Sequence, residues 1–153
     1  MALENIVRLQ GVEGTNALDI RTYHGRVLRK CGQGVEAEEH LQIAWNGLLK
    51  NLERQHLAAS VAVQVAELRL EQERHAAAIE PAEWALNWAL KQEQPEGELI
   101  TSYRLLFART LIGVDRNQEA SGALLECIDY LEASPPPEDS RLREARQLLN
   151  GLP

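Results

Sequence analysis

A pattern of small residues recurs along this chain of 153 residues and constrains its fold more than any other feature. In the first copy Gly25 is followed 12 residues later by Ala37, and Ala44 lies seven residues beyond Ala37. Two further copies keep these spacings and consist of Ala66, Ala78, Ala82 and Ala85, and of Ala108, Ala120, Leu124 and Cys127. The position of Ala37 thus recurs after 41 and then 42 residues. Each copy predicts a hairpin of two helices, with a small residue in each helix where the backbones approach closely.

Helix-forming residues fill the blocks between the glycines and prolines, where Leu, Ala, Glu, Gln and Arg dominate. Pro95 and the run Pro135–Pro137 cannot continue a helix, and Gly151 lies where the last helix is expected to end. We therefore predict an all-α fold. The helices are expected at residues 3–10, 16–31, 35–51 and 56–74, in a segment that ends at Lys91, and at residues 97–112, 117–133 and 139–150.

One segment also has the pattern of a strand. Val61, Val63 and Val65 alternate as in a half-buried strand, and a strand here would suit a nucleotide-binding unit. However, no Gly or Pro lies between Lys50 and Glu80 to end a strand on either side. The same segment has apolar residues at helical spacing, so we predict a helix.

The first copy of the pattern resembles a tetratricopeptide repeat. In YHGRVLRKCGQGVEAEEHLQIA, residues 23–44, the positions that carry the resemblance are Gly25, Gly32, Ala37, Leu41 and Ala44. The other two copies are similar, with alanine in place of the first glycine. The resemblance implies helix-turn-helix units that stack on one another into a superhelix.

The units are longer than the roughly 34 residues of a tetratricopeptide repeat, and their length overlaps that of HEAT and armadillo repeats. The broader prediction is an α-solenoid of about three antiparallel hairpins in a single domain, residues 1–153. The repeats are expected at about 16–51, 56–92 and 97–133, followed by a capping helix at 139–150. Lengthened units of this kind resemble those of bacterial regulatory and adaptor proteins.

Pro81 leaves the register of the second unit open. In the regular frame it lies inside the second helix, where it removes a hydrogen bond. In the alternative frame this helix begins at Glu80, Pro81 takes the favoured first position, and Ala82, Leu86 and Ala89 are the packing residues. We adopt the regular frame for the repeat boundaries.

Residues 32–37, GQGVEA, match the G-x-G-x-x-G/A fingerprint of dinucleotide-binding proteins, and Glu53 follows where a ribose-binding carboxylate is expected. However, Ala37 belongs to the packing pattern, and its counterparts Ala78 and Ala120 occur without any glycine pair. The preceding RVLRK is basic, unlike a buried parallel strand. We therefore predict no nucleotide site and no other cofactor.

Composition argues against several other classes of function. The formal net charge of −7 and the pI near 5.1 oppose binding to nucleic acid or to an anionic membrane. No two histidines have the i, i+4 spacing of metal ligands on a helix, so we expect no metal site. The chain has two cysteines, no long apolar segment and no secretory signal, so we expect a cytoplasmic protein.

The charged segment RTYHGRVLRK, residues 21–30, is the best candidate for a binding site. Thr22, Arg26 and Arg29 share one helix face, with Lys30 close by. The resemblance implies that this face lines a concave groove, which would attract a carboxylate or an acidic peptide. A solvated basic face with no partner is an equally good interpretation. The equivalent candidates in the later units are Val63, Glu67, Leu105 and Arg109.

An alternative patch is aromatic. Trp84 and Trp88 lie four residues apart, and therefore on one face of a helix. Packing between repeats is the simpler interpretation; an exposed patch for a partner or for self-association is the other.

The function that we expect is a scaffold or adaptor that binds a peptide or a partner helix in a concave groove, without chemistry. The alternative is a sensor or oligomerisation module of a larger bacterial regulator. A helical enzyme is disfavoured, because no catalytic motif is present.

Overall fold

Helices form all the regular structure that is described. The computed structural model describes residues 15–133 and 139–153, and these contain seven α-helices, one short 3-10 helix and no strand. The elements are α2 (Thr15–Lys30), α3 (Gly34–Leu49), η1 (Leu52–Arg54), α4 (Gln55–Glu71), α5 (His75–Leu90), α6 (Gly97–Ile112), α7 (Asn117–Ala133) and α8 (Ser140–Asn150). The all-α prediction is confirmed, and the alternating valines lie within α4. The helix expected at residues 3–10 lies outside the described residues.

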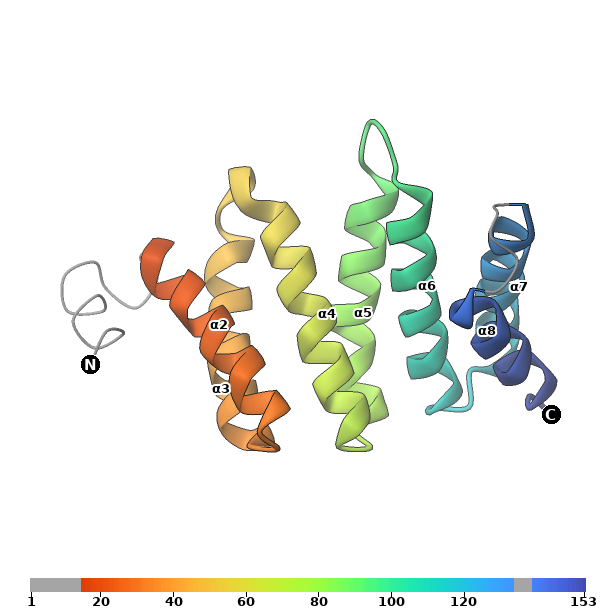
Figure 1. Ribbon diagram of the computed structural model, residues 1–153, viewed down its shortest axis with the longest axis horizontal. Coiled ribbons are helices and arrows are strands. Elements are labelled where there is room, and N and C mark those ends of the chain that lie inside the picture. The colour runs from red at the N-terminus through yellow and green to blue at the C-terminus, as the bar shows by residue number, and fades with distance from the viewer. Residues whose placement is uncertain (1–14, 134–138) are drawn as a thin grey trace.

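The helices are arranged as a row of hairpins (Figure 1). α2 packs on α3, α4 on α5 and α6 on α7, while α3 contacts α4 and α5 contacts α6 to join each hairpin to the next. α8 packs on α7 and also contacts α6 at the end of the row. The first helices of the hairpins, α2, α4 and α6, contact one another in order. They form one side of the molecule.

The recurring small residues lie where the helices of each hairpin meet. Ala37, Ala78 and Ala120 are all 0% exposed. At Gly25 in α2, an added Cβ would lie 2.6 Å from Cγ of Leu41 in α3, so the side chain of Leu41 packs directly on the backbone of Gly25. The packing role predicted for these positions is therefore confirmed.

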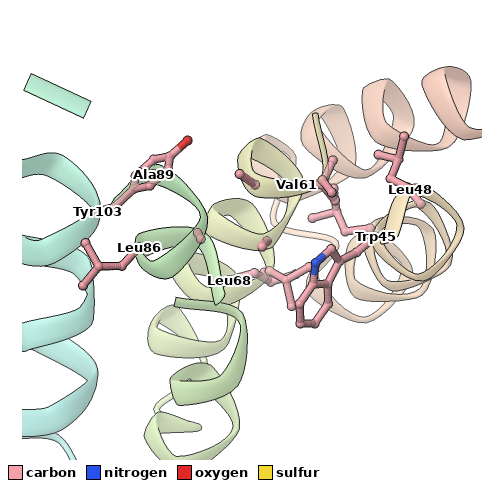
Figure 2. Packing of buried hydrophobic residues seen from close by; sticks show 14 of the residues in the cluster. Trp45, Leu48, Val61, Leu68, Leu86, Ala89 and Tyr103 are labelled. Carbon is pink, nitrogen blue, oxygen red and sulfur yellow. The ribbon is translucent and has the colours of Figure 1, made fainter. Parts of the chain in front are cut away.

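Larger side chains fill the junctions between hairpins (Figure 2). Trp45 and Leu48 of α3 belong to the same buried cluster as Val61 and Leu68 of α4, and further along it includes Tyr103 of α6. This core is continuous from the first hairpin to the third, so the helices that line one side are held at fixed positions relative to one another.

Pro81 lies inside α5, as the regular frame predicts. The helix begins at His75, six residues earlier, so the alternative start at Glu80 is wrong. Pro81 has no N–H to donate to the carbonyl of Ala77 one turn before it. Nη1 of Arg69 in α4 donates to that carbonyl instead, at 2.8 Å. The carbonyl of Ala77 in α5, which Pro81 leaves without a donor, is thus hydrogen-bonded by Arg69 from α4.

Arg69 also links these two helices to α3. Its Nε donates to Oε1 of Glu38 at 2.9 Å, and its Nη2 donates to Oε1 of Gln42 at 2.7 Å. Burial alone would raise the pKa of Glu38, but the hydrogen bonds from Arg69 and Arg74 outweigh it and hold the pKa below its ordinary value. Each of the three guanidinium nitrogens of Arg69 has a protein partner, and through them this residue of α4 is joined to α3 and α5.

The GQGVEA segment forms the turn of the first hairpin. Gly32 has a φ of 75°, in the left-handed region that suits glycine, whereas Gly34 is already the first residue of α3. Ala37 is fully buried against α2. The resemblance to a dinucleotide fingerprint therefore arises from a turn and a packing residue.

Candidate functional site

A groove lies between the basic end of α2 and the middle of α4. It has a volume of about 500 Å³ and is lined by Arg26, Arg29, Lys30, Ser60, Val63, Gln64, Glu67, Glu71 and Tyr103. A smaller hollow of about 140 Å³ shares Arg26, Ser60 and Gln64 with it and extends toward Asp19 and Thr22. The first helices of three hairpins, α2, α4 and α6, therefore contribute to one recess.

Most of the residues predicted to bind a partner come together here. Arg26, Arg29 and Lys30 line the groove from α2, and Val63 and Glu67 line it from α4.

Thr22 lies at the edge of the smaller hollow. Its hydroxyl donates to the carbonyl of Leu18 within its own helix at 3.0 Å. This contact leaves the oxygen able to accept a hydrogen bond.

Two of the predicted residues lie elsewhere. Leu105 is only 5% exposed and belongs to a buried cluster with Leu142 and Ala145 of α8. Arg109 pairs with α8, with its Nε 3.8 Å from Oε1 of Glu144, but its charge is near enough to the groove to help lower the pKa of Glu71. The last helix covers the surface of α6 that is equivalent to the groove, and neither residue is among those that line the groove.

Arg29 is held by two carboxylates of α4. Its Nη1 donates to Oε2 of Glu67 at 2.5 Å, and its Nε and Nη2 donate to the two carboxylate oxygens of Glu71 at 3.0 and 2.5 Å. The hydrogen bond to Glu71, together with Glu67, raises the pKa of Arg29 above its ordinary value against the effect of burial. The same hydrogen bond lowers the pKa of Glu71. Arg29 is therefore part of an ion-pair cluster that joins α2 to α4.

Arg26 and Lys30 are different, because their side chains have no hydrogen-bond or ion-pair partner among the described residues. Both are exposed. The lining of the groove has three cations, Arg26, Arg29 and Lys30, against two carboxylates, Glu67 and Glu71, which gives a formal charge of +1. The whole chain carries −7. The groove is therefore a positive recess on an acidic protein.

Gln64 contributes a polar atom that the sequence did not single out. Its Nε2 donates to the carbonyl of Ser60 at 3.2 Å, which fixes the orientation of the amide. Its Oε1 is buried and has no hydrogen-bond partner. A buried acceptor without a donor costs free energy, on the order of 1 to 3 kcal/mol. The Gln64 side chain lines both the groove and the smaller hollow.

Two other lining residues were also missed. Glu71 lies one helical turn after Glu67, so the position of Glu67 in a groove face was a signal that could have found it. Tyr103 is 9% exposed, and burial raises the pKa of its hydroxyl. No sequence signal indicated that this tyrosine would lie beside α2 and α4.

The tryptophan patch lies apart from the groove. Trp84 packs edge-on against Trp45 of α3, with ring centroids 6.4 Å apart, and is partly buried. Trp88 borders two hollows of about 640 and 310 Å³, which lie beside the segment between α5 and α6. Both tryptophans thus contribute to packing between hairpins and keep one side accessible.

Comparisons with protein-family models and with curated proteins find no match for this chain. Within residues 15–133 and 139–153, no three His, Cys, Asp or Glu side chains are placed to hold a metal ion together. None of the helices described there has the length and apolar character needed to cross a bilayer.

Proposed function

We propose that the chain is a tetratricopeptide-like α-solenoid that acts as a protein-interaction module and binds an acidic, extended peptide in the groove between α2 and α4. The row of hairpins, with small residues buried at offsets of 41 and 42, supports the solenoid. The units, at 41 and 42 residues, resemble the lengthened repeats of bacterial regulatory and adaptor proteins, which supports a role in protein interaction. Binding is by contact alone, without a chemical step.

The observation that carries this proposal is the pair of unpartnered cations beside an unpartnered buried acceptor. Arg26 and Lys30 are available to bind carboxylates of the ligand, whereas Arg29 is already paired with Glu67 and Glu71. Charge-assisted contacts of this kind contribute roughly 1.5 to 3 kcal/mol each when desolvated, and under about 1 kcal/mol when exposed. Between them, Val63 and Tyr103 supply apolar surface.

Gln64 favours an extended peptide over a helix. The main-chain N–H groups inside a helix are already bonded within it, so a helical partner would leave Oε1 of Gln64 unpaired. An extended peptide has free N–H groups and can donate one to this oxygen once the buried Gln64 amide rotates into the groove. The proposed ligand therefore combines acidic side chains with an exposed backbone.

The experiment is to isolate partners by pulldown with mass spectrometry and to titrate the partner against variants of the full chain. Arg26→Glu with Lys30→Glu is expected to weaken binding at least tenfold, and added salt is expected to weaken wild-type binding in parallel. The control, Arg143→Glu, reverses one exposed charge on α8 at the other end of the row and is compared with Arg26→Glu alone. Equal affinity for wild type and both variants would move the interface away from the groove.

A second candidate interface is the surface around Trp84 and Trp88, where two hollows meet an accessible aromatic pair. If the chain is instead a sensor or oligomerisation module of a larger bacterial regulator, this is the surface that we expect to associate. Substitution of Trp88 by alanine would then abolish partner capture while the groove variants leave it unchanged.

A further inference from the structure

Two histidines are in contact across the first hairpin, outside the groove. The ring of His24 in α2 packs edge-on against that of His40 in α3, with the ring centroids 5.6 Å apart. Each of them is next in the sequence to Gly25 or Leu41, and there the side chain of Leu41 packs directly on the backbone of α2. The two imidazoles therefore lie at the contact that holds α2 on α3.

Arg21 adds a permanent positive charge to this contact. It lies three residues before His24, and so on the same face of α2. Its Nε and the Nδ1 of His40 are both buried, and neither atom has a hydrogen-bond partner among the described residues. Hydrogen bonds at these two nitrogens therefore do not offset a further positive charge on the cluster of Arg21, His24 and His40.

Burial and positive neighbours oppose protonation of His40. Burial lowers the pKa of its imidazole, and the charges of Arg21 and His24 lower it further. Glu39 raises this pKa, with a smaller effect than either positive neighbour. Glu39 and Glu36, which lies one turn before His40, are both exposed, so water weakens their attraction for an imidazolium. The folded hairpin therefore favours the neutral form of His40.

The other groups near this hairpin do not compensate for positive charge at the contact. The ring of Tyr23, a neutral phenol, also contacts His24. Charged groups of α4 and η1, which pack beside α2 or α3, have partners of their own: Glu67 and Glu71 pair with Arg29, Arg69 with Glu38, and Arg54 with Asp19.

We propose that Arg21, His24 and His40 form a pH-sensitive switch that holds α2 on α3 while both imidazoles are neutral and loosens α2 when they are protonated. Because the pKa of His40 is lower in the folded protein, its contribution to stability is fully present above the unfolded pKa, about 6.5, and is lost as the pH falls through the folded value. Repulsion between two unit charges 5.6 Å apart changes an equilibrium constant about threefold at the dielectric constant of water, and more than about a hundredfold at an effective value of about 20.

The switch acts on the helix that carries the cations of the groove. Because Arg26, Arg29 and Lys30 lie on α2, the fraction of molecules with a complete groove falls with the pH. The inference itself does not depend on the proposed ligand, and the chain alone is enough to test it.

Hydrogen exchange of the full chain, read by mass spectrometry on peptides from α2, tests the switch. It is measured at about pH 7.5 and about pH 5.5, on either side of the ordinary histidine pKa. Glu38 and Glu71 have lowered pKa values and stay ionised between these two pH values. After correction for the intrinsic exchange rate, the opening constant of α2 is expected to be at least about threefold higher at the lower pH.

Three variants show whether the two histidines cause the change. His40→Gln and His24→Gln each remove one titratable ring and are expected to abolish most of the rise. His24 is exposed, so its replacement leaves the core intact even if that of His40 does not. His56→Gln, at an exposed histidine of α4, is the matched control and is expected to keep the full rise.

The proposal is overturned if the opening constant of α2 is the same at both pH values, or if His24→Gln and His40→Gln keep the full rise. An equal rise in peptides from α6 would also overturn it, because the whole fold would then be loosening.

An NMR titration of the His40 ring tests the part of Arg21. Arg21→Gln removes a positive neighbour and is expected to raise the pKa of His40. Arg26→Gln removes a charge of the same helix that does not act on His40, and is expected to leave this pKa as in the wild type. An equal pKa of His40 in the wild type and in Arg21→Gln would contradict the cluster.

Discussion

Two arginines of this protein join helices in different ways. Arg69 has each of its three guanidinium nitrogens bonded to α3 or to α5, so its charge is committed to the junction between helices. Arg29 is equally occupied by Glu67 and Glu71, but it stands beside two cations without partners, Arg26 and Lys30. The comparison separates charge that stabilises the fold from charge that remains for binding. A cluster of basic residues in the sequence contains both kinds.

The largest effect is expected at the junction of α3, α4 and α5. Arg69→Met leaves the carboxylate of Glu38 with Arg74 as its only arginine partner among the described residues and the carbonyl of Ala77 without its donor. We expect a loss of about 2 to 4 kcal/mol in the free energy of unfolding, measured by urea denaturation. Arg26→Met, which changes an arginine without partners, is the control and is expected to cost under about 0.5 kcal/mol.

Pro81 sharpens this prediction. In a Pro81→Ala background the N–H of residue 81 can bond to the carbonyl of Ala77 within α5, so Arg69→Met is expected to cost about 1 kcal/mol less than in the wild type. The measurement is a double-mutant cycle by urea denaturation. Strictly additive losses in the free energy of unfolding would mean that the hydrogen bond from Arg69 to Ala77 does not contribute to stability in solution.

The packing of the hairpins gives the next effect. Ala37→Leu and Ala120→Leu each place a larger side chain at a fully buried contact between two helices, and each is expected to cost about 1 to 3 kcal/mol. Thermal unfolding measures the loss. Leu125→Ala, on the exposed side of α7, is the control. If both alanine variants melt like the wild type, the spacing of small residues does not mark helix contacts.

The pH dependence is the smallest of the stability effects. The pKa of Glu38 and that of Glu71 are both lowered in the folded protein. Their contribution to stability is therefore present above the unfolded pKa, about 4.3, and is lost as the pH falls through the folded values. We expect Arg69→Met to flatten the dependence of stability on pH below about pH 5, whereas Arg26→Met keeps the slope of the wild type. Equal slopes would contradict the ion pair at Glu38.

The sequence predicted the helices well because local signals set them. The helix boundaries that were predicted agree with the described α-helices to within three residues, since glycine, proline and the periodic apolar residues lie next to the ends that they determine; the start of α5 was left open. Local sequence signals could not predict the ion pairs of Arg29. Its partners lie 38 and 42 residues away on another helix, and only the packing of α2 on α4 brings them together.

Leu105 illustrates the other limit of repeat-based prediction. By its position in the third unit it is equivalent to Val63, which lines the groove, but α8 follows the last hairpin and covers it. A repeat pattern indicates which positions are equivalent, but it does not indicate what covers the last unit.

Arg29 is unsuitable for testing binding. The variant Arg29→Glu would place a third carboxylate beside Glu67 and Glu71 and would disturb the contact of α2 with α4.

The central claim, that a partner occupies the groove between α2 and α4, is tested most directly by NMR titration of the full chain with the acidic peptide that the pulldown identifies. The side-chain amide of Gln64 and the methyl groups of Val63 report on the groove, and the indole N–H groups of Trp84 and Trp88 report on the alternative patch. We predict that the Gln64 and Val63 signals shift with saturation while both indole signals stay in place. Shifts of the Trp84 and Trp88 indoles with Gln64 and Val63 unchanged would contradict the account.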